Sequence, residues 1–169
     1  MKRSLYRVRQ FWHALTARPT HSDLREVRAF LPPALFLLFS RLQPAEQAHA
    51  IAVFRKTSQA DPHPDLATAA LLHDVGKIMY PLSVWQRALI VLENRQPNGR
   101  GEAAENGGQA VHRLVADRHP DWGAELAGKA GATPLAAALI RRHQDPAPSN
   151  ARSLEDRLLA VLQAADNQS

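Results

Sequence analysis

Residues 69–77 read Ala-Ala-Leu-Leu-His-Asp-Val-Gly-Lys, an apolar run that ends in an adjacent histidine and aspartate. The apolar residues predict a buried helix that ends near Gly76. A histidine and an aspartate at the end of a buried helix lose hydration energy unless they pair with each other or bind a metal ion. This stretch therefore predicts a helical core in which His73 and Asp74 form either a hydrogen-bonded pair or part of a metal site.

The rest of the chain has apolar residues at helical spacing, and no stretch alternates polar and apolar residues as a β-strand would. The sequence therefore predicts an all-α, single-domain helical bundle, in which N-terminal helices within residues 1–43 pack on a core formed by residues 44–169. Asp65 is the expected cap of one helix, and the glycine-rich segment 96–108 is expected to form a surface loop or a lid. Prolines, caps and turn residues predict helices at 4–17, 20–30, 33–42, 44–58, 66–73, 81–95, 109–118, 122–130, 134–142 and 153–165.

The composition limits the chemistry that the chain can carry. Its 169 residues suffice for one domain with its own core. The chain has no cysteine, so it forms neither disulfides nor thiolate metal sites, and any transition metal must bind to His, Asp or Glu. The formal net charge of +5 makes anionic partners plausible, with nucleotides, nucleic acid and membrane surfaces as the obvious classes.

The N-terminal residues 2–12 interleave basic and aromatic side chains, which predicts a basic amphipathic helix. Such a helix either packs on the core with a solvated face or contacts nucleic acid or lipid. The most apolar stretch, residues 30–39, is too short for a membrane span, and no secretory signal is apparent. The expected location of the protein is the cytoplasm.

Four further polar residues lie at the ends or on the inner faces of predicted apolar helices. His49 lies within the helix at 44–58, and His119, His143 and Asp166 each lie at the end of a later helix. Taken singly, each of them is an ordinary core residue. Together with the pair at 73–74, they suggest side chains from five helices that converge on a metal centre in a helical bundle.

The order of these residues resembles the HD-domain superfamily of metal-dependent phosphohydrolases over residues 44–167. Residues 73–77 match the family's usual His-Asp-x-Gly-Lys sequence, and residues 119–126 resemble the third-ligand motif of the HD-GYP branch. After His143 the chain lacks the second histidine and the Gly-Tyr-Pro of that branch, which argues against a cyclic-di-GMP phosphodiesterase of that type. The segment after Lys77 also lacks the Glu-Asp pair expected of alarmone hydrolases.

The resemblance implies a dinuclear centre in which one carboxylate bridges two metal ions. The implied ligands are, for the first ion, His49, His73, Asp74 and Asp166 and, for the second, His119, His143 and the bridging Asp74. Imidazole and carboxylate ligands suit iron, manganese, zinc or nickel. The implied reaction is hydrolysis of a nucleotide or a related small phosphate ester by a metal-bound hydroxide.

Substrate contacts are expected from basic side chains near these ligands. Lys77 projects over the same face as His73 and Asp74 if their helix continues. It is either a phosphate contact that takes part in catalysis beside Asp74 or a charge that stabilises the helix end. Arg141 and Arg142 could neutralise a substrate phosphate, although at least one of them is expected to be solvated.

His112 precedes His119 by seven residues, so a single helix that contained both would place them on one face. In that arrangement His112 is a candidate substrate contact. If residues 117–120 end the helix instead, His112 is a surface residue.

Two other classes of function remain open. The same six ligands resemble those of HD-type mixed-valent di-iron oxygenases. An HD scaffold can also serve as a nucleotide-sensing module without turnover, although the presence of all six ligand positions argues against lost activity. The sequence favours the hydrolase.

Overall fold

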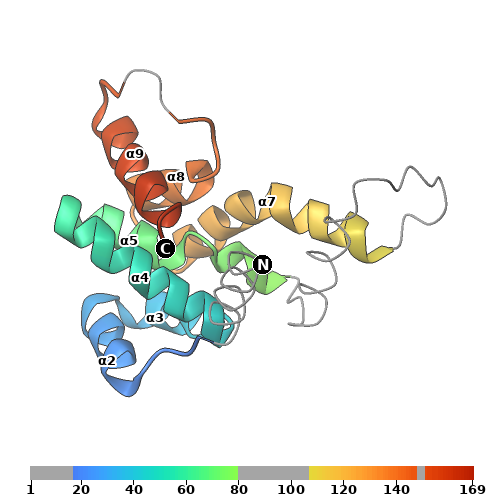
Figure 1. Cartoon of the computed structure of the whole chain (residues 1–169), viewed down its shortest axis with the longest axis horizontal. Helices are drawn as coiled ribbons and strands as arrows, with labels where there is room; N and C mark the ends of the chain where they lie inside the picture. Colours follow the sequence, from blue (N-terminus) through green and yellow to red (C-terminus); the bar gives the residue numbers. More distant parts are fainter. Residues whose placement is uncertain (1–16, 80–106, 148–150) are drawn as a thin grey trace, which may run out of the picture.

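The computed structural model describes residues 17–79, 107–147 and 151–169. These residues form seven α-helices and one 3₁₀ helix and contain no β-strand, which confirms the predicted all-α fold (Figure 1). Residues 4–16 of the first predicted helix, the helix predicted at 81–95, the basic residues 2–12 and the segment 96–106 lie outside the described residues. The elements are α2 (His21–Phe30), α3 (Pro33–Phe39), α4 (Pro44–Ala60), α5 (Pro64–Leu72), the 3₁₀ helix η1 (Val75–Met79), α7 (Gly107–Lys129), α8 (Pro134–Arg142) and α9 (Leu154–Asp166).

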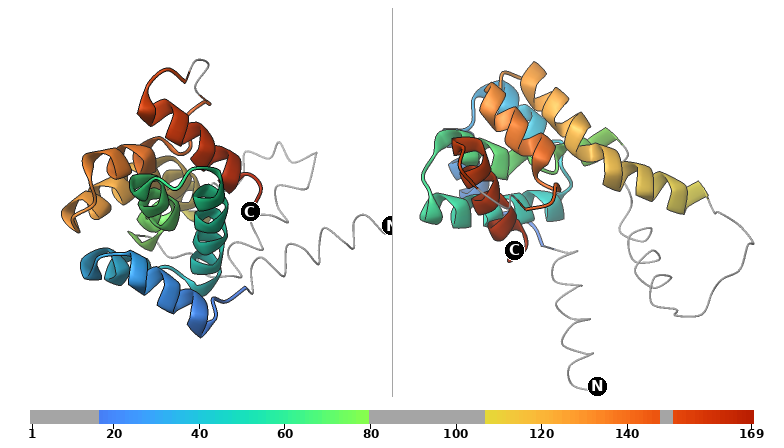
Figure 2. Two further views of the ribbon diagram at one scale, coloured as in Figure 1. Left: turned by 90° about the vertical axis from the view of Figure 1, so that its left-hand side faces the viewer. Right: turned by 90° about the horizontal axis from the view of Figure 1, so that it is seen from above.

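Helix α5 lies in the middle of the bundle. Figures 1 and 2 place α2 and α3 on one side of the α4–α5 pair and α8 and α9 on the other. Because α5 packs against α4, α8 and α9, its sequence is apolar almost all round. Val27 of α2 and Leu35 of α3 belong to the same hydrophobic cluster as the later helices. Among the described residues, the largest fully buried apolar side chains are Phe39, Leu66, Leu71, Leu72, Leu139, Ile140, Leu158, Leu159 and Leu162.

The starts of the helices follow the expected capping chemistry, with one exception. At α2, Thr20 Oγ1 accepts from the backbone N–H of Asp23, and the Asp23 carboxylate accepts from the backbone N–H of Thr20, at 3.2 and 2.7 Å. The expected cap of α5 by Asp65 is wrong. His63 is the cap, and its Nδ1 accepts from the Asp65 backbone N–H at 3.2 Å. Pro64 suits the first helical position because it has no N–H to leave unpaired, so the helix begins earlier.

The predicted ends of the helices differ from the observed ends by a few residues. Helix α8 has its predicted bounds, and α9 begins directly after Ser153, whose side chain accepts from the backbone N–H of Asp156. Helix α3 ends at Phe39, earlier than expected, and α4 continues to Ala60, slightly further than expected. Such differences are ordinary because the last turn of a helix frays easily.

Two helices were predicted at 109–118 and 122–130, but the structure has the single helix α7, which contains Pro120. A proline inside a helix removes one backbone hydrogen bond, which is why the sequence predicted a break. The carbonyl that loses its partner is that of Ala116, and it lies 2.9 Å from Nδ1 of His119. This side-chain hydrogen bond replaces the missing one, and α7 continues. Residues 107 and 108, expected in a loop, begin this helix.

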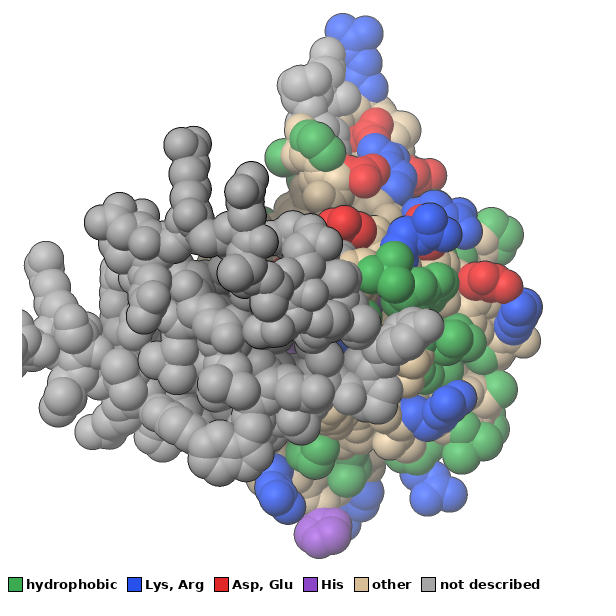
Figure 3. Space-filling model, turned by 90° about the vertical axis from the view of Figure 1, so that its right-hand side faces the viewer, with side chains coloured by type: hydrophobic (Ala, Val, Ile, Leu, Met, Phe, Trp, Pro, Cys, Tyr) green, Lys and Arg blue, Asp and Glu red, His purple; other side chains and the backbone are tan. Residues whose placement is uncertain are grey.

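Within the part of the chain that the structure describes, none of the helices is long and apolar enough to cross a bilayer. Figure 3 shows one face of the molecule, where the Asp and Glu side chains of the described surface lie among Lys and Arg side chains in its upper part. Opposite charges in such proximity screen each other, so this part of the described surface is not uniformly basic.

Candidate metal centre

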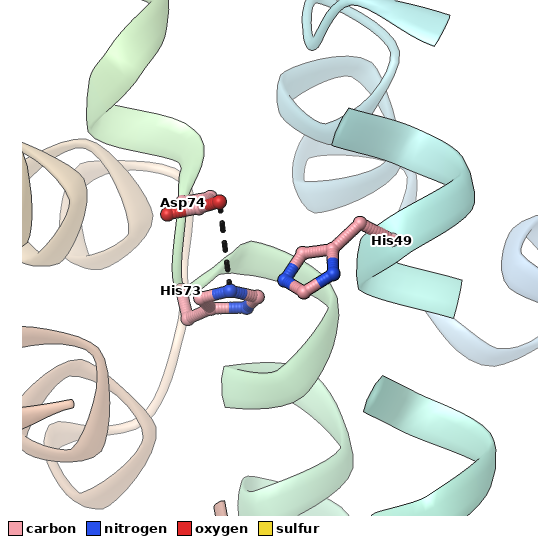
Figure 4. A group of neighbouring side chains, drawn as sticks. All are labelled: His49, His73 and Asp74. Atoms are coloured by element: carbon pink, nitrogen blue, oxygen red, sulfur yellow. Dashed lines mark ion pairs between the residues drawn. The ribbon is translucent and has the colours of Figure 1, made fainter. Parts of the chain in front are cut away.

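His73 and Asp74 lie in the turn between α5 and η1, at the centre of the bundle. Helix α5 ends at Leu72, and the side chains of His73 and Asp74 are only 1% and 7% exposed. Figure 4 shows the ring of His49 pointing toward this pair from the neighbouring helix α4. The centroids of the His49 and His73 rings are 5.3 Å apart. Asp166, the last residue of α9, places Oδ1 2.9 Å from His49 Nε2 and 3.6 Å from His73 Nε2.

Two more histidines approach Asp74 from its other side. His119 comes from the interior of α7, and His143 directly follows the end of α8. Both are buried, and their Nε2 atoms are 3.3 Å apart. Asp74 Oδ1 lies 3.4 Å from Nε2 of His119 and 4.0 Å from Nε2 of His143. The structure thus brings together all six residues that the sequence singled out.

The carboxylate of Asp74 belongs to two groups at once. Its Oδ1 faces His119 and His143, whereas its Oδ2 lies 3.6 Å from Nε2 of His73. The potential ligand atoms of His49, His73 and Asp74 all lie within 4.8 Å of one another, and the same holds for Asp74, His119 and His143. A carboxylate with one oxygen toward each group has the geometry of a bridging ligand.

The three buried histidines present the same nitrogen to Asp74. Nδ1 of His73 is 2.9 Å from the Ala70 carbonyl, Nδ1 of His143 is 2.8 Å from that of Ile140, and His119 makes the same kind of contact. A carbonyl only accepts hydrogen bonds, so each Nδ1 carries the hydrogen, and a neutral ring then keeps a lone pair on Nε2.

Convergence of these lone pairs fits a cation. The Nε2 atoms of His119 and His143 lie 3.3 Å apart, and with the hydrogen on Nδ1 of both rings each presents a lone pair to the other and to the Asp74 carboxylate. Such an arrangement is repulsive between the nitrogens and favourable around a positive charge. Imidazole and carboxylate are the ligands that iron, manganese, zinc and nickel accept. The donor set therefore fits the divalent transition metals expected from the sequence.

The protonation of the site agrees with this fit. Burial, assisted by the neighbouring His73, lowers the pKa of His143 to about 4, so its ring is neutral at neutral pH. Burial raises the pKa of the Asp74 carboxyl, but its neighbours His73 and Lys77, the latter an ammonium, outweigh burial and hold this pKa well below its usual range. Burial also raises the pKa of the Asp166 carboxyl, but the hydrogen bond from His49 and the neighbouring His73 outweigh burial, so this pKa is lowered. Both carboxyl groups are therefore ionised.

Lys77 reaches the site by a different route from the one expected. The α-helix does not continue to Lys77, because α5 ends at Leu72 and Lys77 lies in η1. Its Nζ nevertheless donates to Asp74 Oδ2 at 2.6 Å, and its side chain is 31% exposed. Lys77 thus links the buried carboxylate to the surface of the molecule.

The other expected substrate contacts, Arg141, Arg142 and His112, differ from one another in their surroundings. Arg142 donates to Glu155 at 2.5 Å and to Asp156 at 3.0 Å, which ties α8 to α9. The Nε of Arg141 lies 3.5 Å from Asp121 Oδ1, and this arginine side chain is more than half exposed. His112 lies in α7 together with His119, so the helix is continuous between them, but its side chain is outside the described part of the chain.

Two residues that position the site were not recognised from the sequence. Gly76 was expected only to end a helix, but a Cβ built there would lie 2.0 Å from the carbonyl oxygen of His119. Its place in the segment 73–77 was the available signal. Gln163 donates from Nε2 to the carbonyl oxygens of His143 and Asp145, at 3.2 and 2.8 Å, and so ties the end of α8 to α9. A polar residue on a helix gave no signal of this role.

Comparison with known proteins assigns the family. The family model described as HD domain matches residues 47–168, which is most of the chain and includes the six candidate ligands. No curated protein and no solved structure showed a significant match. The His-Asp pair at the centre of a helical bundle and the extent of the family match lead to one conclusion. The chain belongs to the HD-domain family.

Proposed function

We propose that this HD-domain protein is a metal-dependent phosphohydrolase that acts on a nucleotide or a related small phosphate ester. The observation that carries the proposal is the position of Asp74, whose two oxygens face two separate groups of histidines. The proposed ligands are His49, His73, Asp74 and Asp166 for one divalent ion and Asp74, His119 and His143 for a second.

The proposed ions and the protein groups have different roles in the hydrolysis reaction. Two divalent ions, when bound, would supply an activated water and stabilise the charge that develops on the phosphate oxygens. The protein contributes fixed lone pairs on the histidines, the buried ionised carboxylate of Asp74 and the partly exposed ionised carboxylate of Asp166. Because these groups are held by the ends and interiors of packed helices, they need little rearrangement during the reaction.

Lys77 is the best-placed side chain to bind the substrate phosphate. Its ammonium already contacts Asp74, and its partial exposure lets it reach an oxygen on the solvent side of the site. Arg141 is the second choice. It is exposed, and its contact with Asp121 is long, at 3.5 Å, and lies at the surface, so the guanidinium can leave it to bind a phosphate. Arg142 is held by Glu155 and Asp156, so we assign its charge to the contact between α8 and α9.

A cavity beside the site can receive the rest of the substrate. It has a volume of about 620 Å³ and borders His143 and Asp166, one ligand from each proposed ion. Gln144, Asp145 and Gln163 also line it, and its described lining contains no lysine or arginine. Amides and a carboxylate suit a neutral group that exchanges hydrogen bonds, such as a sugar or a nucleobase. The proposed substrate is therefore the phosphate ester of a neutral polar alcohol.

Metal reconstitution tests this function directly. The protein is purified without a metal-affinity tag, stripped of metal and supplied singly with iron, manganese, zinc or nickel, and a set of nucleotides and phosphate esters is screened under strict anaerobiosis. We expect phosphate release that depends on the added metal. Oxygen uptake with an iron-loaded protein would support the oxygenase instead, and tight nucleotide binding without turnover with every metal would indicate a sensor.

Lys77→Met is expected to lower kcat/KM for the phosphate ester about tenfold to a hundredfold and to leave the metal content unchanged. The reason is the loss of one charge-assisted hydrogen bond, which contributes roughly 1.5–3 kcal/mol. The measurement combines steady-state kinetics with elemental analysis of the same sample. Lys129→Met is the matched control, because Lys129 is exposed on α7 and its ion pair among the described residues is with Glu125.

If Lys77→Met hydrolyses the substrate at the parental rate, Lys77 serves only to pair with Asp74. The phosphate contact would then be sought at Arg141.

A further inference from the structure

Two of the buried histidines at the centre of the bundle orient their rings in the same way. His73 and His143 each follow directly after the last residue of a helix, and each donates from Nδ1 to a carbonyl three residues earlier. These acceptors, the carbonyls of Ala70 and Ile140, lie in the last turn of their helices. Carbonyls in a last turn have no N–H partner within the helix. A histidine placed there therefore finds a free acceptor that directs its Nε2 inward.

His119 cannot find an acceptor in this way. It lies in the interior of α7, which continues to Lys129. In a regular helix the carbonyl of Ala116 would accept from the backbone N–H of residue 120, four positions later. Residue 120 is a proline and has no N–H. The Ala116 carbonyl is consequently free, and Nδ1 of His119 lies 2.9 Å from it.

We propose that Pro120 is a positioning residue for His119, which it orients by withholding a backbone N–H from the Ala116 carbonyl. The free carbonyl accepts Nδ1–H of His119 and holds Nε2 toward Asp74 and His143. Proline thus produces in mid-helix the acceptor that a helix end provides for the other two histidines. This inference rests on the proposed metal-binding role of His119 and adds what orients its ring.

The alternative acceptor is already engaged. Nδ1 of His119 is also 2.9 Å from the Val115 carbonyl, but that carbonyl is the helical partner of the His119 backbone N–H. The Ala116 carbonyl has no such competitor. Without it, the ring could carry its hydrogen on Nε2, which lies 3.3 Å from Nε2 of His143. That tautomer would remove the lone pair that the proposed second ion requires.

The test restores the missing N–H and reads the tautomer of His119 in the metal-free protein. Nitrogen NMR of the ¹⁵N-labelled histidine side chains distinguishes Nδ1–H from Nε2–H, and His119→Gln identifies the signal of residue 119. In Pro120→Ala and Pro120→Val, we expect the Nε2–H tautomer of His119 to gain population at a pH where the ring is neutral. Both variants restore the N–H, but alanine and valine fill the buried position 120 differently. An effect that both variants share therefore comes from the N–H and not from a loss of packing.

The same variants are then titrated with metal. Loss of a hydrogen bond that orients a ligand histidine typically weakens metal binding 10- to 100-fold, so we expect about this loss for the second ion and little change for the first. Pro134→Ala is the matched control, because Pro134 is the first residue of α8, where an N–H has no helical partner.

Retention of the Nδ1–H tautomer and of parental affinity in both Pro120 variants would overturn the proposal. A different outcome is that the variants shift the tautomer but the unsubstituted protein binds no second ion. That outcome would confirm the role of Pro120 in orienting the ring and reject the second metal site. The two failures are therefore distinguishable.

Discussion

Asp74→Asn is expected to abolish hydrolysis with every metal and to remove most bound metal. The substitution keeps the size of the side chain but deletes the charge that faces both groups of histidines, through Oδ1 on one side and Oδ2 on the other. Lys77 loses its charged partner at the same time, but it is partly exposed and can turn to solvent. The measurements are metal content per chain, phosphate release and the helical circular dichroism of the variant.

Two further variants test whether the effect is specific to the carboxylate at position 74. Asp121→Asn removes a carboxylate that is more than half exposed beside Arg141, and it should retain both metal and turnover. His143→Ala should lose one ion and keep the other, because His143 belongs only to the group with His119. A fully active Asp74→Asn protein with parental metal content would reject the bridging role. Loss of both ions in His143→Ala would argue against two separable sites.

Gly76→Ala is expected to destabilise the metal-free protein by roughly 3 kcal/mol or more. The added Cβ would lie 2.0 Å from the carbonyl oxygen of His119 and 2.8 Å from the backbone nitrogen of Gly123. Both contacts are with backbone atoms, so no change of side-chain rotamer relieves them, and η1 must move away from α7. In thermal unfolding followed by circular dichroism, this corresponds to a fall in Tm of roughly 6–12 °C.

Gly128→Ala, in α7, is the matched control. A Cβ at Gly128 meets nothing within 4 Å, so alanine should leave stability unchanged or raise it by up to about 1 kcal/mol. The displacement of α7 in Gly76→Ala should also weaken the second metal ion, because His119 moves with its backbone. A Gly76→Ala protein as stable as its parent would show that η1 and α7 do not need this close approach.

The local pattern of the sequence determined the fold class and the identity of the candidate ligands. Apolar residues at helical spacing predict helices wherever they form an amphipathic or buried surface, and α8 therefore has the bounds that its sequence predicts. Polar residues at the ends of such helices, such as His143 and Asp166, stand out because burial is costly unless they have a partner. Both signals are local, so a sequence alone carries them.

The three-dimensional structure decided what the local pattern left open. Pro120 predicts a break, but α7 continues, and the ring of His119 satisfies the nearby carbonyl that proline leaves free. Other features depend on partners more distant in the chain. Arg142 is a plausible phosphate contact until its pairing with Glu155 shows how its charge is used. The close approach of Gly76 to His119 joins segments 43 positions apart, from 76 to 119, and packing alone brings them together. Hydrogen bonds and contacts across such separations depend on the arrangement of the helices, which no local periodicity encodes.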